Sequence, residues 1–113
     1  MFKIIKNNKD LIESDFLSLD FSIGEGWIFL INDFFKDLKT LNLSENFKVK
    51  SIKEKYGDLI ILTKNDNEEV KDLIQIYKKK ASETCIECSK KGNLNISKNK
   101  TLTILCEECS KLN

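Results

Sequence analysis

The sequence contains no histidine, no arginine and no proline. Without histidine the chain has no residue of the type that most often acts as a general base, and it lacks the commonest zinc ligand besides cysteine. Because arginine is absent, all 19 basic residues are lysines, and no planar guanidinium is available for bidentate recognition of phosphate or guanine. These absences disfavour histidine-based catalysis and arginine-based base recognition.

Long apolar runs are also missing. The longest run, residues 27–31, falls far short of the roughly 18 residues that a membrane-spanning helix needs. Residues 1–15 become charged too early to supply the apolar centre of a secretory signal. We therefore expect a cytoplasmic protein, in which thiols stay reduced or bind metal. The length of 113 residues and the apolar content of 41% suit a single domain with a hydrophobic core.

Four cysteines are the most specific feature that is present. Cys85 and Cys88 form one C-x2-C pair, and Cys106 and Cys109 form a second pair after 17 intervening residues. This spacing is typical of a zinc ribbon, in which two tight knuckles each point two thiolates at one ion. We predict a Zn²⁺ ion bound by all four cysteines. Because four protein ligands close a tetrahedral site to water, the predicted role is structural rather than catalytic.

The residues between the two pairs support this interpretation. The segments "NLNIS" and "TLTIL" alternate polar and apolar residues, and "KNK" between them suits a turn. An antiparallel hairpin would return the second knuckle to the level of the first. Gly92 is expected to supply the backbone conformation that leaves the first knuckle.

Three other roles for the four cysteines fit the sequence less well. Disulfides need an oxidising compartment, for which the sequence carries no signal. A thioredoxin-like redox site uses one C-x2-C pair at the start of a helix, whereas this chain has two symmetric pairs. A rubredoxin-like iron site uses similar ligands, but residues 81–113 contain no aromatic residue to shield such a centre. Zinc is the favoured interpretation.

Hydrophobic periodicity predicts an α+β body before the ribbon. Apolar residues at helical spacing predict a helix over residues 26–41 and a second helix over residues 68–82, with Asp66 or Asn67 as the N-cap of the second. Between them, period-two alternation predicts a β-hairpin over residues 46–63.

Two further local features complete the predicted fold. The hairpin is expected to reverse at Gly57-Asp58, and "MFKII" at the start reads as a short strand. The predicted architecture is two helices and a β-hairpin with a C-terminal zinc ribbon built on the four cysteines. Residues 1–84 form the body, and residues 85–113 form a ribbon docked directly on it, as one compact domain.

The charge is divided unevenly along the chain. Residues 1–77 hold 11 lysines and 14 acidic residues, a balance of −3, whereas residues 78–113 hold 8 lysines and 4 acidic residues, a balance of +4. The basic C-terminal part favours nucleic-acid binding as one alternative. Against it, the ribbon has no aromatic residue on which bases could stack.

The remaining residues favour binding over catalysis. Asp33 and Asp37 lie one helical turn apart but are more typical of a solvated helix face, and we predict no enzymatic activity. Trp27 stands at the start of an amphipathic helix, where core packing is favoured. Trp27, Phe29 and Phe35 are candidate partner-binding residues if they are exposed. The leading hypothesis is a non-enzymatic protein-binding module with a structural zinc site. The alternative is a zinc-ribbon nucleic-acid-binding or transcription accessory protein.

Three motifs in this order resemble a group of small uncharacterised proteins of bacteria and phages. They are Gly24-Glu25-Gly26-Trp27, the segment "VKSIKEKYG" at residues 49–57, and the paired C-x2-C motifs. The resemblance spans roughly residues 24–109. It implies a mobile-element or bacterial conflict setting, in which an immunity-type or phage-encoded inhibitor acts by covering the surface of another protein. No activity is established for the group, so the resemblance implies no catalytic residue.

Overall fold

The computed structural model describes residues 2–13, 21–96 and 99–112. It shows helices and strands in mixed order, which confirms the predicted α+β class. The body, residues 1–84, contains α1 (Phe2–Asn7), β1 (Phe21–Ser22), α2 (Ile28–Leu38), β2 (Lys48–Lys55), β3 (Asp58–Lys64) and α3 (Glu68–Ser82). The ribbon, residues 85–113, contains β4 (Asn93–Ile96), β5 (Leu102–Leu105) and α4 (Glu107–Leu112). No helix in the described part of the chain is long and apolar enough to cross a membrane.

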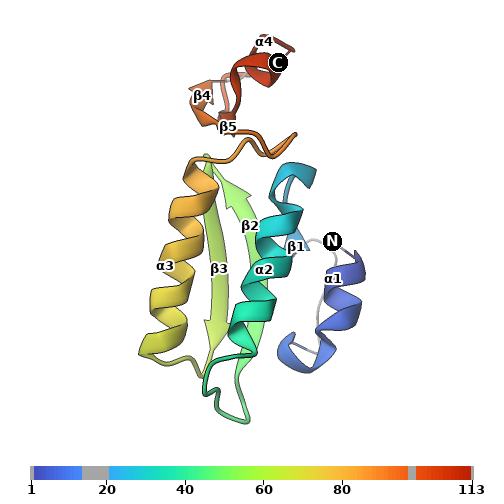
Figure 1. The fold of residues 1–113 in the computed structure, drawn as a ribbon, viewed down its shortest axis with the longest axis vertical. Coiled ribbons are helices and arrows are strands. Elements are labelled where there is room, and N and C mark those ends of the chain that lie inside the picture. The colour runs from blue at the N-terminus through green and yellow to red at the C-terminus, as the bar shows by residue number, and fades with distance from the viewer. Residues whose placement is uncertain (1, 14–20, 97–98, 113) are drawn as a thin grey trace.

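The body is a three-stranded sheet with helices packed on it. The strand order is β1-β2-β3, with β1 parallel and β3 antiparallel to β2. Helices α2 and α3 lie side by side over one face of the sheet, and α1 lies beside α2 (Figure 1). The ribbon lies beyond one end of the sheet, where the β2–β3 turn, the start of α2 and the end of α3 come together (Figure 1).

The β2–β3 hairpin is confirmed, but its turn lies one residue earlier than predicted. Tyr56 and Gly57 form the turn with φ angles of 54° and 82°, and Asp58 already pairs with Lys55. Positive φ at both central residues is typical of a type I′ turn, whose twist matches that of the flanking strands. The Gly57 N–H also donates to the Glu54 carboxylate at 2.7 Å, which helps to close the turn.

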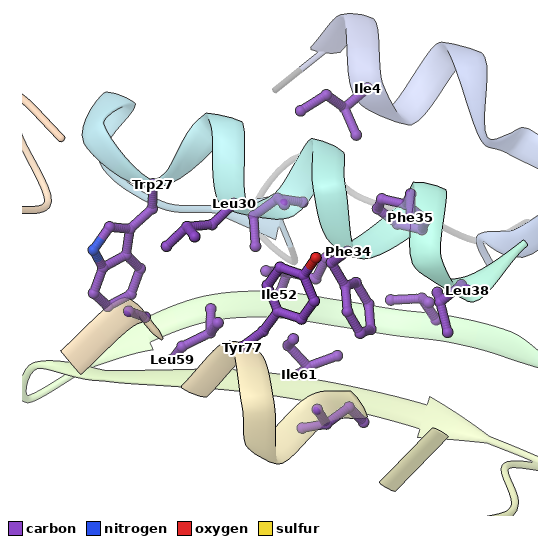
Figure 2. Packing of buried hydrophobic residues seen from close by; sticks show 14 of the residues in the cluster. Ile4, Trp27, Leu30, Phe34, Phe35, Leu38, Ile52, Leu59, Ile61 and Tyr77 are labelled. Carbon is purple, nitrogen blue, oxygen red and sulfur yellow. The ribbon is translucent and has the colours of Figure 1, made fainter. Parts of the chain in front are cut away.

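The first residues form a helix, so the short strand predicted for "MFKII" is wrong. Helix α1 spans Phe2–Asn7, and the buried side chain of Asn8 donates to the Ile4 carbonyl at 2.7 Å. Ile4 is buried beside α2 (Figure 2). An apolar run of five residues is too short to show whether its period is two or 3.6, so the sequence did not distinguish the two structures.

The predicted helix at residues 26–41 is shorter than expected. It opens with a 3-10 turn at Glu25–Trp27, continues as α2 and ends at Leu38. Its largest side chains fill the core against the sheet and α3, where Phe34 packs edge-on against Tyr77 with ring centroids 5.5 Å apart (Figure 2). Burial raises the pKa of Tyr77, and its hydroxyl donates to Asp37 at 2.5 Å.

Helix α3 matches its prediction at both ends, and Asn67 is the N-cap. The Asn67 side-chain oxygen accepts from the Val70 N–H at 3.0 Å. We expect Asn67→Ala to lower the free energy of unfolding by about 1 kcal/mol, because this N–H loses its partner. Urea denaturation followed by circular dichroism measures the change. Asn67→Asp keeps the capping oxygen but loses the hydrogen bond that the Asn67 amide donates to the Asn42 carbonyl at 3.0 Å, so it should recover part of the stability. An equal loss in both variants would assign the effect to the bond with Asn42 and not to the cap.

Candidate metal centre

The four cysteine sulfurs meet at one point, as the sequence predicts. The Sγ atoms of Cys85, Cys88, Cys106 and Cys109 all lie within 4.8 Å of one another, and those of Cys88 and Cys106 are 3.5 Å apart. All four thiols are free, with no disulfide among them. Four sulfurs about 2.3 Å from a tetrahedral zinc ion would be about 3.8 Å apart, which is close to this arrangement. The cysteines are therefore positioned to hold one metal ion.

The hairpin of the ribbon brings the two pairs together. Strands β4 and β5 pair antiparallel, with Asn93 opposite Leu105 and Ile96 opposite Leu102. Cys106 follows β5 directly and so returns to the level of the first pair. The second pair then enters α4, where the Cys109 N–H points at the Cys106 sulfur at 3.4 Å.

The first knuckle turns at Ser89, which corrects the prediction for Gly92. Ser89 has φ of 73°, and the chain closes on itself through the Cys85 N–H, which donates to the Lys90 carbonyl at 2.7 Å. Gly92 does not have positive φ. It is instead a point of close approach, because a Cβ there would lie 3.0 Å from the Cys85 nitrogen and from the Leu105 carbonyl carbon.

The environment of the thiols differs from one sulfur to another. Burial raises the pKa of Cys85. Hydrogen bonds from backbone N–H groups at Cys106, Glu87 and Cys88 have the larger, opposite effect, and the pKa of Cys85 falls to about 7. The pKa of Cys109 is raised, first by its hydrogen bond with the Cys106 thiol and then by burial. Four neighbouring thiols therefore do not all ionise on their own near neutral pH. A divalent cation at their centre would favour the thiolate at each of them.

The first knuckle docks on the Gly24-Glu25-Gly26 segment of the body. The Gly26 N–H donates to the Ile86 carbonyl at 2.7 Å, and the Ser89 hydroxyl donates to the Gly26 carbonyl at 2.8 Å. A Cβ on Gly24 would lie 2.4 Å from the Ile86 oxygen, and a Cβ on Gly26 would lie 2.2 Å from the Cys85 oxygen. Both positions therefore need glycine because the backbone of the knuckle lies against them. The sequence shows two glycines before a predicted helix, but no sequence pattern indicates that these glycines contact the first cysteine knuckle.

No protein-family model, curated protein or solved structure matches this chain. Any inference about function therefore rests on the residues and their arrangement.

Trp27 is a core residue at the junction of body and ribbon, so the core packing favoured for it is confirmed and its candidacy as a partner-binding residue is wrong. Its side chain is 0% exposed. The indole N–H donates to the carbonyl of Thr84, the residue before Cys85, at 2.8 Å. Trp27 therefore packs in the core with its polar edge bonded to the segment that leads into the ribbon.

Phe35 is also buried, and Phe29 is the one predicted partner-binding residue that remains accessible. Phe35 is 1% exposed because it lies on the α1 side of α2, near Ile4 (Figure 2). Phe29 is 46% exposed and lines a cleft of about 610 Å³ together with residues of α1 and Ser89 of the knuckle. The predicted three-residue patch does not exist, because Trp27 and Phe35 are both buried in the core.

Proposed function

We propose that this protein is a non-enzymatic, cytoplasmic protein-binding module whose ribbon is held together by a structural Zn²⁺ ion. An immunity-type or phage-encoded inhibitor, which acts by covering the surface of its target, is the form of this function that fits best. The four cysteines support the metal part of the proposal, because a complete set of four thiolates suits zinc and leaves no position open for a catalytic water.

The distribution of exposed apolar side chains carries the binding part of the proposal. Among the described residues, eight large apolar side chains are exposed, and four of them belong to the short ribbon. These four are Leu94, Ile96, Leu102 and Leu112. Apolar side chains that gather at one end of a molecule are typical of a surface that another protein covers. The ribbon is thus both the part that the metal would hold and, among the described residues, the part with the most exposed large apolar side chains for its length.

Nucleic-acid binding is the second candidate, and one observation favours it. Residues 89–105 contain four lysines and no acidic residue. Tyr56, in the β2–β3 turn, is 67% exposed, with the Lys55 ammonium 5.9 Å from the centre of its ring. A single aromatic platform beside lysines could stack one base. The exposed residues of the ribbon itself are aliphatic, however, and aliphatic side chains offer no stacking surface.

Affinity purification from the native host distinguishes the two functions. We expect a stoichiometric protein partner, identified by mass spectrometry, that stays bound as the salt concentration is raised, because an apolar interface is weakly screened. Binding of nucleic acid through lysines should instead weaken steeply with salt. Recovery of nucleic acid without a stoichiometric protein would contradict the proposal and support the alternative.

A further inference from the structure

One face of the ribbon hairpin is entirely aliphatic. Leu94 lies opposite Ile104, and Ile96 lies opposite Leu102, in the antiparallel register of β4 and β5. Directly opposed residues of an antiparallel pair point to the same side, as do residues two apart along a strand. These four side chains therefore share one side of the hairpin, which we call the aliphatic face, while Asn93, Asn95 and Thr103 belong to the other side.

The body covers only the inner end of the aliphatic face. Ile104 is 3% exposed and belongs to the main core. Leu94 remains 57% exposed but touches the β2–β3 turn on one side, where a Cβ on Gly57 would lie 2.8 Å from it. At the outer end, Ile96 is 69% exposed and Leu102 is 36% exposed. The aliphatic face is therefore in contact with the body at its inner end and exposed to solvent at its outer end.

We infer that the outer end of the aliphatic face is the docking surface for a partner protein that presents apolar side chains bordered by acidic ones. The inference rests on the proposed protein-binding function and specifies where and with what chemistry it acts. A metal-held hairpin suits this role, because side chains on a rigid scaffold lose less conformational freedom on binding.

The charges of the hairpin define the chemistry of the partner. Lys90 is already paired with Glu108 at 3.2 Å, but the following residues 91–105 carry three further lysines and no acidic residue. The β2–β3 turn adds no net positive charge, because Lys55 stands there beside Glu54 and opposite Asp58, so the positive charge belongs to the hairpin itself. A second copy of the chain would set lysines against lysines, which disfavours self-association. An acidic border complements these charges, and an apolar centre fits Ile96 and Leu102.

The test compares Ile96→Thr/Leu102→Thr with Leu62→Thr. Threonine keeps the β-propensity of these positions, and Leu62 is a matched control because it is a strand residue of the body that is 53% exposed. Metal content and the fluorescence of Trp27 first establish that each variant is folded. The probe is a displayed library of random short peptides, selected against the wild-type protein and then measured against each variant.

We expect the selected peptides to contain aliphatic or aromatic residues flanked by Asp or Glu. The double variant should bind them roughly tenfold or more weakly, as is common when two central contacts of an interface are truncated, and Leu62→Thr should bind within about twofold of wild type. Failure to enrich such peptides, or equal affinity in the double variant, would overturn the inference.

Two other binding partners of the aliphatic face, a second copy of the chain and nucleic acid, would each give a distinct experimental result. A wild-type dimer in sedimentation that the double variant loses would assign the face to a second copy. Binding of a labelled single-stranded DNA that is lost in the double variant would assign it to nucleic acid. Either result overturns the inference. If the wild type and the double variant both retain the same stoichiometric protein from the host, the protein-binding function is supported, but the aliphatic face is not its binding surface. Recovery of nucleic acid alone would contradict both the proposed function and the docking surface.

Discussion

Removal of the metal with a chelator is expected to unfold the ribbon and to shift the fluorescence of Trp27 to longer wavelength. The ribbon's own buried cluster is small and consists of Cys85, Leu105 and Cys106, so that its contacts with the body, chiefly through Ile104, are its other support. A structural zinc site contributes an apparent binding free energy of about 10–16 kcal/mol, as much as the stability of a whole domain. Chains shorter than about 40 residues usually need a metal or disulfides to fold.

Trp27 reports this change because it is the single tryptophan of the chain and is bonded to Thr84. Elemental analysis should find one zinc per chain before chelation, and limited proteolysis afterwards should cleave within residues 85–113 while the body resists. Cys106→Ser should behave like the chelated protein, because a hydroxyl is a poor zinc ligand, whereas Ser110→Ala in α4 should keep its metal. A purified, reduced protein without stoichiometric metal, or a chelated protein with unchanged fluorescence, would exclude a metal-held ribbon.

The parts of the structure that the sequence predicts are those specified by local patterns. The β2–β3 hairpin and α3 follow from periods of two and 3.6 over long segments, and the metal centre follows from the spacing of four cysteines. The turn lies at Tyr56-Gly57, one residue before its predicted position, because glycine can occupy either central position of a hairpin turn.

Other features that the sequence did not specify are contacts between segments that are far apart in the chain. Phe35 is buried in the same core cluster as Ile4 of α1, and the sequence of α1 is too short to show a helical period. The need for glycine at position 26 depends on a knuckle about 60 residues later, which no local pattern can indicate. Burial of Trp27 likewise depends on the segment that ends at Thr84.

Residues from two distant segments of the body meet the ribbon at its junction with the body. Gly26 contacts the first knuckle, Trp27 bonds the segment before it, and Gly57 packs against Leu94 of the ribbon hairpin. Segments that are separated in sequence are thus brought into contact around one end of the sheet. These residues share one physical role, which is to hold the ribbon against the body. The position of the ribbon therefore depends on contacts with several distant segments of the chain.

Gly26→Ala is expected to undock the ribbon without removing the metal. The added Cβ would lie 2.2 Å from the Cys85 oxygen and 2.6 Å from the Ile86 carbonyl carbon, and both are backbone atoms that a rotamer change cannot move. The knuckle must shift, and the hydrogen bond from the Gly26 N–H to Ile86 is lost with it. We expect the free energy of unfolding to fall by about 3 kcal/mol, the upper range for overpacking. The gain from a less flexible unfolded chain, about 0.4–1 kcal/mol, is smaller and of opposite sign.

Urea denaturation, metal content and Trp27 fluorescence together separate docking from metal binding. Gly26→Ala should retain one metal per chain, because the four cysteines are untouched, while its tryptophan emission changes. Glu25→Ala, at the exposed position between the two glycines, should match the wild type. Gly92→Ala, where the nearest atoms would be 3.0 Å away, should cause a smaller loss than Gly26→Ala. Loss of metal in Gly26→Ala would mean that docking and metal binding are one cooperative step, and wild-type stability in this variant would show that the knuckle does not lie against the body.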